Sequence, residues 1–92
     1  MKYFVTGGCG FLGSNICEKL LESDSNEVTV FDNLSRVGAF ENLEWLRSRG
    51  PIKFIHGDIR NEDDVRNGVK LAQPDVIYHL AGQVAVTVSI EK

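Results

Sequence analysis

The chain has 92 residues, a net charge of −3 and 42% hydrophobic residues. These values are ordinary for one small globular domain, and they argue against a nucleic-acid partner, which would favour a basic patch. No apolar run reaches about 18 residues and no signal-peptide pattern opens the chain, so we expect a cytoplasmic protein without a membrane partner.

Strand-like and helix-like segments alternate along the chain. Apolar, β-branched and aromatic runs predict strands over 2–6, 27–31, 52–56 and 75–81. Apolar spacings of three and four predict helices from Phe11 to a polar stop at 23–26, over 39–49, and from a cap at Asp58 or Asn61 to Pro74. The order βαβαβαβ predicts an α/β fold, the N-terminal part of a Rossmann-type doubly wound parallel sheet with strand order 3-2-1-4. The tail 82–92 has no assigned structure.

A glycine-rich loop, TGGCGFLG over residues 6–13, separates the first strand from the first helix. Its spacing fits both GxxGxxG and GxGxxG, in the strand–loop–helix context that a dinucleotide-binding motif needs. One glycine lets the chain turn off the strand, and another leaves room for a pyrophosphate against main-chain N–H groups. Gly13 lets the helix lie close on the sheet. A simple tight turn, the alternative, would need only one glycine.

Two acidic residues follow predicted strands at the same edge of the sheet. Asp32 can accept hydrogen bonds from both ribose hydroxyls of an adenosine and would repel a 2′-phosphate, which favours NAD over NADP. Arg36 leaves NADP open, because a guanidinium also binds phosphate. Asp58 can accept from an adenine amino group, with Ile59 packed on the ring. The alternatives are a loop-capping role for Asp32 and a helix N-cap for Asp58.

We expect structural rather than catalytic or metal-binding roles for the cysteines and histidines. Cys9 and Cys17 form no CxxC pair, which agrees with a reducing compartment, and we interpret them as a small filler and a core residue. His56 and His79 end strands, where we expect backbone groups to satisfy them. We predict no metal site.

Four stretches, TGGCGFLGS, FDNLSR, HGDIRN and HLAGQVAVT, resemble the extended short-chain dehydrogenase/reductase family, the NAD-dependent epimerases and dehydratases. The resemblance covers nearly the whole chain and is narrowest to members that epimerise a nucleotide-bound sugar at C2. It implies NAD as cofactor and a nucleotide-sugar substrate. A 4-epimerase, a 4,6-dehydratase and a non-catalytic NAD(H)-binding module remain alternatives. The glycine spacing argues against a methyltransferase-like nucleoside site.

The resemblance also implies which residues contact the cofactor and the substrate. The cofactor residues are Gly7, Gly10, Phe11 and Leu12 at the pyrophosphate, Asp32, Asn33, Ser35 and Arg36 around the adenosine ribose, Asp58 and Ile59 at the adenine, and Leu80, Ala81, Gly82 and Gln83 toward the nicotinamide ribose. Ser89 matches a substrate-side serine, and Val88 stands where the family has a threonine.

The catalytic motif of the family has no counterpart in these residues. The family's base is a tyrosine in a Tyr-x-x-x-Lys motif, and neither Tyr3 nor Tyr78 has a lysine four residues later. We therefore expect residues 1–92 to be the N-terminal part of a dinucleotide-binding domain, without catalytic residues and inactive alone. Without a following parallel strand, the apolar segment 75–81 should be an exposed edge through which the chain self-associates.

Overall fold

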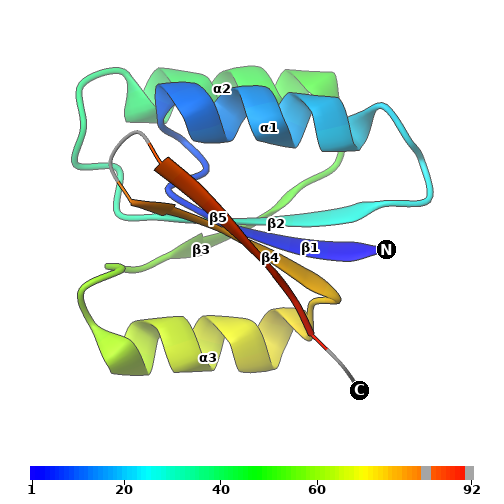
Figure 1. Cartoon of the computed structure of the whole chain (residues 1–92). Helices are drawn as coiled ribbons and strands as arrows, with labels where there is room; N and C mark the ends of the chain where they lie inside the picture. Colours follow the sequence, from blue (N-terminus) through cyan, green and yellow to red (C-terminus); the bar gives the residue numbers. More distant parts are fainter. Residues whose placement is uncertain (82–83, 91–92) are drawn as a thin grey trace.

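The computed structural model describes residues 1–81 and 84–90, which form a five-stranded sheet with helices on both faces (Figure 1). The strands are β1 (Lys2–Thr6), β2 (Glu27–Asp32), β3 (Lys53–His56), β4 (Val76–Ala81) and β5 (Val84–Ser89). Helices α1 (Phe11–Leu21) and α2 (Ala39–Arg49) cover one face of the sheet, and α3 (Glu62–Ala72) covers the other. In the described part of the chain, no helix is long and apolar enough to cross a membrane.

The predicted fold class is confirmed. The sheet order is β3-β2-β1-β4-β5, and β1 pairs in parallel with both β2 and β4. Every predicted strand and helix is present, with strand ends that differ from the prediction by at most one residue. Of the two predicted caps for α3, Asn61 is correct, because its side chain accepts hydrogen bonds from the amides of Asp63 and Asp64.

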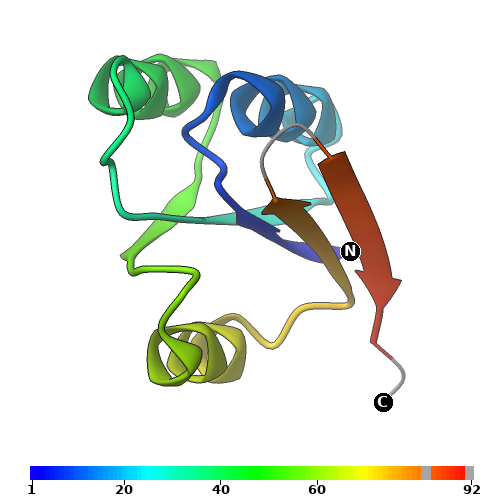
Figure 2. The same cartoon turned by 60° about the vertical axis from the view of Figure 1, so that its left-hand side comes forward.

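The last strand, β5, was not predicted and changes the edge of the sheet. It pairs antiparallel with β4, from Ala81–Val84 to Val76–Ser89. Only residues 82 and 83 separate the two strands, which is too short for the crossover that parallel pairing requires. The prediction that β4 is an exposed edge is therefore wrong, because β4 lies between β1 and β5 (Figure 2). The predicted self-association required an exposed β4 edge, and β5 covers that edge.

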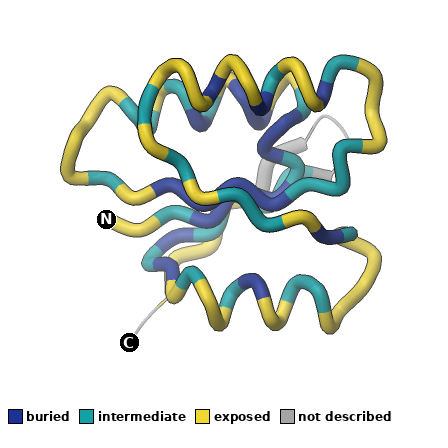
Figure 3. Tube along the Cα trace, turned by 180° about the vertical axis from the view of Figure 1, so that it is seen from behind, coloured by how far each residue is buried: buried dark blue, intermediate teal, exposed yellow. Residues whose placement is uncertain are grey.

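The core lies on both sides of the central strands, where Figure 3 shows the longest buried stretches. Toward α1 and α2, the side chains of Val5, Val30 and Leu46 are fully buried. Toward α3, Phe4 and Phe31 pack edge to face, with ring centroids 5.5 Å apart. The parallel pairing of β1 with β2 and β4 brings the carboxyl ends of these strands to one edge of the sheet.

Candidate functional site

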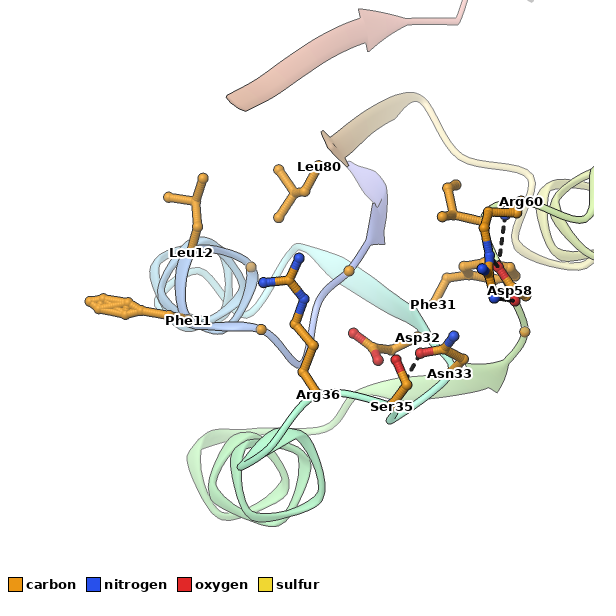
Figure 4. A pocket seen from close by; sticks show the side chains of 15 residues that line it. Phe11, Leu12, Phe31, Asp32, Asn33, Ser35, Arg36, Asp58, Arg60 and Leu80 are labelled. Carbon is orange, nitrogen blue, oxygen red and sulfur yellow. Dashed lines mark hydrogen bonds and ion pairs between the residues drawn. The ribbon is translucent and has the colours of Figure 1, made fainter. Parts of the chain in front are cut away.

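A cavity of about 640 Å³ opens at the carboxyl ends of the parallel strands (Figure 4). The chain leaves β1 toward β2 on one side and β4 lies on the other, so the cavity sits where the strand order reverses. This is the position at which doubly wound sheets bind ligands. The lining residues are Gly7, Gly10, Phe11, Leu12, Gly13, Phe31, Asp32, Asn33, Ser35, Arg36, Gly57, Asp58, Ile59, Arg60 and Leu80.

The glycine loop forms the floor of the cavity and turns sharply at Gly7, whose φ is +66°. Only glycine adopts this left-handed conformation at no steric cost. At Gly13, an added Cβ would overlap the Gly7 carbonyl oxygen and lie 2.7 Å from the Cα of Gly8. The predicted close approach of α1 is therefore confirmed, although the partner is the main chain of the loop rather than the body of the sheet.

The N-terminus of α1 presents unpaired N–H groups to this cavity. The N-cap residue, Gly10, has no side chain that could cap these groups. The first hydrogen bond of the helix runs from the Ser14 amide to the Gly10 carbonyl oxygen, 2.9 Å away. The amides of Phe11, Leu12 and Gly13 have no hydrogen-bond partner among residues 1–81 and 84–90. Free amides and the positive end of the helix dipole make this a site for an anion such as a phosphate.

The Asp32 carboxylate ties two loops of the cavity together. Its Oδ2 accepts a hydrogen bond from the Cys9 amide at 3.0 Å, and its Oδ1 accepts one from the Leu34 amide at 2.7 Å. Leu34 has a φ of +59°, so this bond supports a strained backbone position. The loop-capping interpretation of Asp32 is confirmed. Each carboxylate oxygen keeps a second lone pair, so a ribose contact stays a prediction.

The positive charge available to a ligand comes from Arg36. In Figure 4 its side chain extends from the β2–α2 loop in the direction of the N-terminus of α1. Its guanidinium forms no ion pair with the part of the chain that the structure describes, whereas Arg60 is paired with Asp58 at 2.8 Å. A free guanidinium and a helix N-terminus on one cavity favour a ligand with two or more negative charges.

Arg60 stabilises the ionised form of Asp58. Hydrogen bonds from the Arg60 side chain and amide, more than charge alone, lower the pKa of Asp58 from 3.8 to about 2. Because the pKa is lowered on folding, the stabilisation from this pair is complete above about pH 4 and is lost as the pH falls through about 2. We expect the carboxyl carbon of Asp58 to titrate near pH 2 by NMR. A midpoint near 4 would contradict the pairing.

The thiols and histidines take no part in the cavity surface. Cys9 is fully buried, and burial, followed by the nearby Asp32 charge, raises its pKa to about 12, which confirms the filler interpretation. Cys17 lies in the core, as predicted. The expectation of a backbone partner for His79 is wrong, because its Nδ1 lies 3.1 Å from the Thr6 hydroxyl. In residues 1–81 and 84–90, no group of three or more His, Cys, Asp or Glu side chains is arranged so that it could hold a metal ion.

The cavity brings together eleven of the predicted cofactor residues, from Gly7, directly after β1, to Leu80 on β4. Ala81 ends β4 beside them, whereas Gly82 and Gln83 lie outside the described residues. Ser89 pairs with Val76 at the amino end of β4, away from the cavity. The lining residues that were not predicted as contacts are Gly13, Phe31, Gly57 and Arg60. Each of the four adjoins a predicted residue in the sequence, and this adjacency was the available signal.

The comparisons with known proteins agree with this geometry. A family model described as GDP-mannose 4,6 dehydratase matches residues 4–92. The chain belongs to this family. Among its curated relatives, CDP-paratose 2-epimerase of Salmonella typhi is 55% identical over 91 residues, and dTDP-glucose 4,6-dehydratase of Escherichia coli is 36% identical over 90 residues. The predicted resemblance to NAD-dependent epimerases and dehydratases is confirmed.

Two similar solved structures share the fold and are complexes with NAD. The dTDP-glucose 4,6-dehydratase of Bacillus anthracis in complex with NAD superposes with a TM-score of 0.77 at 28% identity, over 90% of this chain and 27% of that one. The UDP-glucuronic acid 4-epimerase of Bacillus cereus in complex with NAD superposes with a TM-score of 0.68 at 38% identity, over 88% of this chain and 27% of that one. The Salmonella epimerase match covers 99% of this chain and 27% of that protein, and the Escherichia match 98% and 25%. The chain thus spans about a quarter of the length of these relatives.

Proposed function

We propose that this chain is the NAD-binding part of a nucleotide-sugar epimerase that acts at C2 of the sugar and works in the cytoplasm. The observation that carries the proposal is the cavity itself, with three free amides at the start of α1 and Asp32 at the end of β2. The 55% identity to a CDP-paratose 2-epimerase supports the finer assignment. A 4,6-dehydratase is the second candidate, supported by the 36% identity to the Escherichia coli enzyme.

Different residues of the cavity fit the successive groups of an NAD molecule. The free amides of Phe11 and Leu12 would bind the pyrophosphate, with Arg36 as a counter-charge. The remaining lone pairs of Asp32 would accept from the ribose hydroxyls, and Asp58 would accept from the adenine amino group. Leu80 would form the wall toward the nicotinamide.

The chemistry of such an epimerase divides between the cofactor and the protein. Bound NAD supplies a hydride acceptor and donor for transient oxidation at the sugar carbon. These 92 residues bind and orient that cofactor. We assign no catalytic base to them, since neither tyrosine belongs to a Tyr-x-x-x-Lys motif. We therefore expect no turnover of a nucleotide sugar by this chain alone.

Calorimetric titration of the chain with NAD, NADP and S-adenosylmethionine tests the proposal. We expect NAD to bind more tightly than NADP, because the Asp32 carboxylate would repel a 2′-phosphate, and we expect no binding of S-adenosylmethionine. Absence of binding at about 1 mM NAD, which means an affinity weaker than about −4 kcal/mol, would contradict a cofactor role for these residues.

A further inference from the structure

The carboxylate of Asp58 is held by three donors from a single neighbour. Its Oδ1 accepts from the amide and the Nε of Arg60, at 2.8 and 3.1 Å, and its Oδ2 accepts from the terminal guanidinium nitrogen at 2.8 Å. A carboxylate accepts about four hydrogen bonds, two on each oxygen. Arg60 therefore uses both positions on Oδ1 and leaves one on Oδ2. The planar fork also fixes the plane of the carboxylate.

The turn that carries this pair is itself well anchored. The Asp58 amide donates to the Asp64 carboxylate at 3.0 Å, and the Asn61 amide donates to the Asp58 carbonyl at 2.9 Å. The Asp58 and Arg60 side chains are 30% and 83% exposed, so their ion pair contributes little to the stability of the fold. The effect of the fork is therefore on the orientation of Asp58.

The surroundings of this carboxylate match the edge of an amino-substituted base. Asn33, at the end of β2, lines the same cavity, and its side-chain amide helps to lower the pKa of Asp58. An amide NH₂ is the same kind of donor as the exocyclic amino group of adenine. Ile59, which is 40% exposed in the same cavity, offers apolar surface to a flat ring.

We infer that Arg60 is a positioning residue that makes the base end of the cavity selective for an exocyclic amino group. The Asp58 carboxylate is ionised and accepts hydrogen bonds at neutral pH with or without Arg60. The fork holds it in one orientation with one free position on Oδ2, so an amino group placed there is favoured and a carbonyl oxygen is repelled. This inference rests on the proposed binding of NAD and concerns a residue that touches Asp58 rather than the base.

The test compares NAD with nicotinamide hypoxanthine dinucleotide, in which a carbonyl oxygen replaces the adenine amino group. At neutral pH the wild-type chain should bind NAD at least about tenfold more tightly than the analogue. Arg60→Met removes the fork, and Arg60→Lys keeps the charge as a point donor. Both variants should lower the affinity ratio to about threefold or less, while thermal unfolding changes little.

Arg66→Met is the matched control, because Arg66 forms a similar exposed pair with Asp63 at 2.9 Å outside this cavity. It should keep the wild-type ratio. The inference is overturned if either Arg60 variant keeps that ratio, if Arg66→Met lowers it equally, or if the wild-type chain binds both dinucleotides equally well. Binding of neither dinucleotide would instead contradict the proposed function.

Discussion

Replacement of Gly13 by alanine should unfold the chain at a markedly lower temperature and abolish NAD binding. The added methyl would overlap the Gly7 carbonyl and approach the Cα of Gly8 to 2.7 Å. Both neighbours are main chain, so the helix must move away from the loop. We expect a cost of about 3 kcal/mol or more. In a domain of this size that lowers Tm by about 12–24 °C, measurable by circular dichroism.

Gly10→Ala is the matched control for this prediction. The nearest atom to its added Cβ is the Gly7 carbonyl oxygen at 3.4 Å, and φ of −76° suits any residue. The fold should therefore remain within a few degrees of the wild-type Tm. The methyl would stand in the cavity against the pyrophosphate, so NAD affinity should fall at least about tenfold. Equal Tm losses in the two variants would refute the distinction between a packing glycine and a ligand-approach glycine.

Asp32→Asn should weaken the fold and shift the cofactor preference together. An asparagine has one acceptor oxygen, so it cannot accept from both the Cys9 and the Leu34 amides as Asp32 does. The loss of one such bond costs about 1–3 kcal/mol in the free energy of unfolding. Removal of the charge also relieves repulsion of a 2′-phosphate. We expect the ratio of NAD to NADP affinity to fall about tenfold, or about 1.4 kcal/mol, by calorimetry.

Asp58→Asn provides the comparison for that shift. It removes a carboxylate at the end of the next strand, in the same cavity, but that carboxylate is proposed to bind the adenine rather than the ribose. Both cofactors should bind more weakly to this variant, with their affinity ratio unchanged. If Asp58→Asn changes the ratio as much as Asp32→Asn, the cavity responds to net charge and the specific role of Asp32 is wrong.

The fold was predictable from sequence because its signals are local. Apolar spacing and punctuation by Gly50-Pro51 placed the strands and helices, and the crossover rules then gave their order. β5 was missed although VAVTVS has valine at alternate positions, which is typical of a strand. Its antiparallel pairing with β4 follows from the two-residue connection, which the sequence analysis did not weigh. Sequence also could not separate Asp58 from Asn61 as a cap, since both residue types suit that position.

The candidate site was predictable only as far as residue types indicate chemistry. A dinucleotide needs carboxylates such as Asp32 and Asp58 and positions without a side chain, such as the glycines of the loop. Asp32, Asp58 and three of these glycines line one cavity. The bond from the Cys9 amide to Asp32 could not be predicted, because a main-chain donor has no sequence signature. Arg60 was overlooked as a neighbour of the predicted pair, and its role depends on fork geometry that spacing does not show.

The pairing of β1 with β4 has a consequence for the order of folding. Thr6 and His79 are opposite each other although 73 residues separate them, so this contact closes a very long loop. The β4–β5 hairpin is local and should form in about 1–10 μs. The β1–α1–β2 unit also has short-range contacts. We expect the hairpin to dock late, so that Leu80 closes its side of the cavity only after the glycine loop and Asp32 are already assembled.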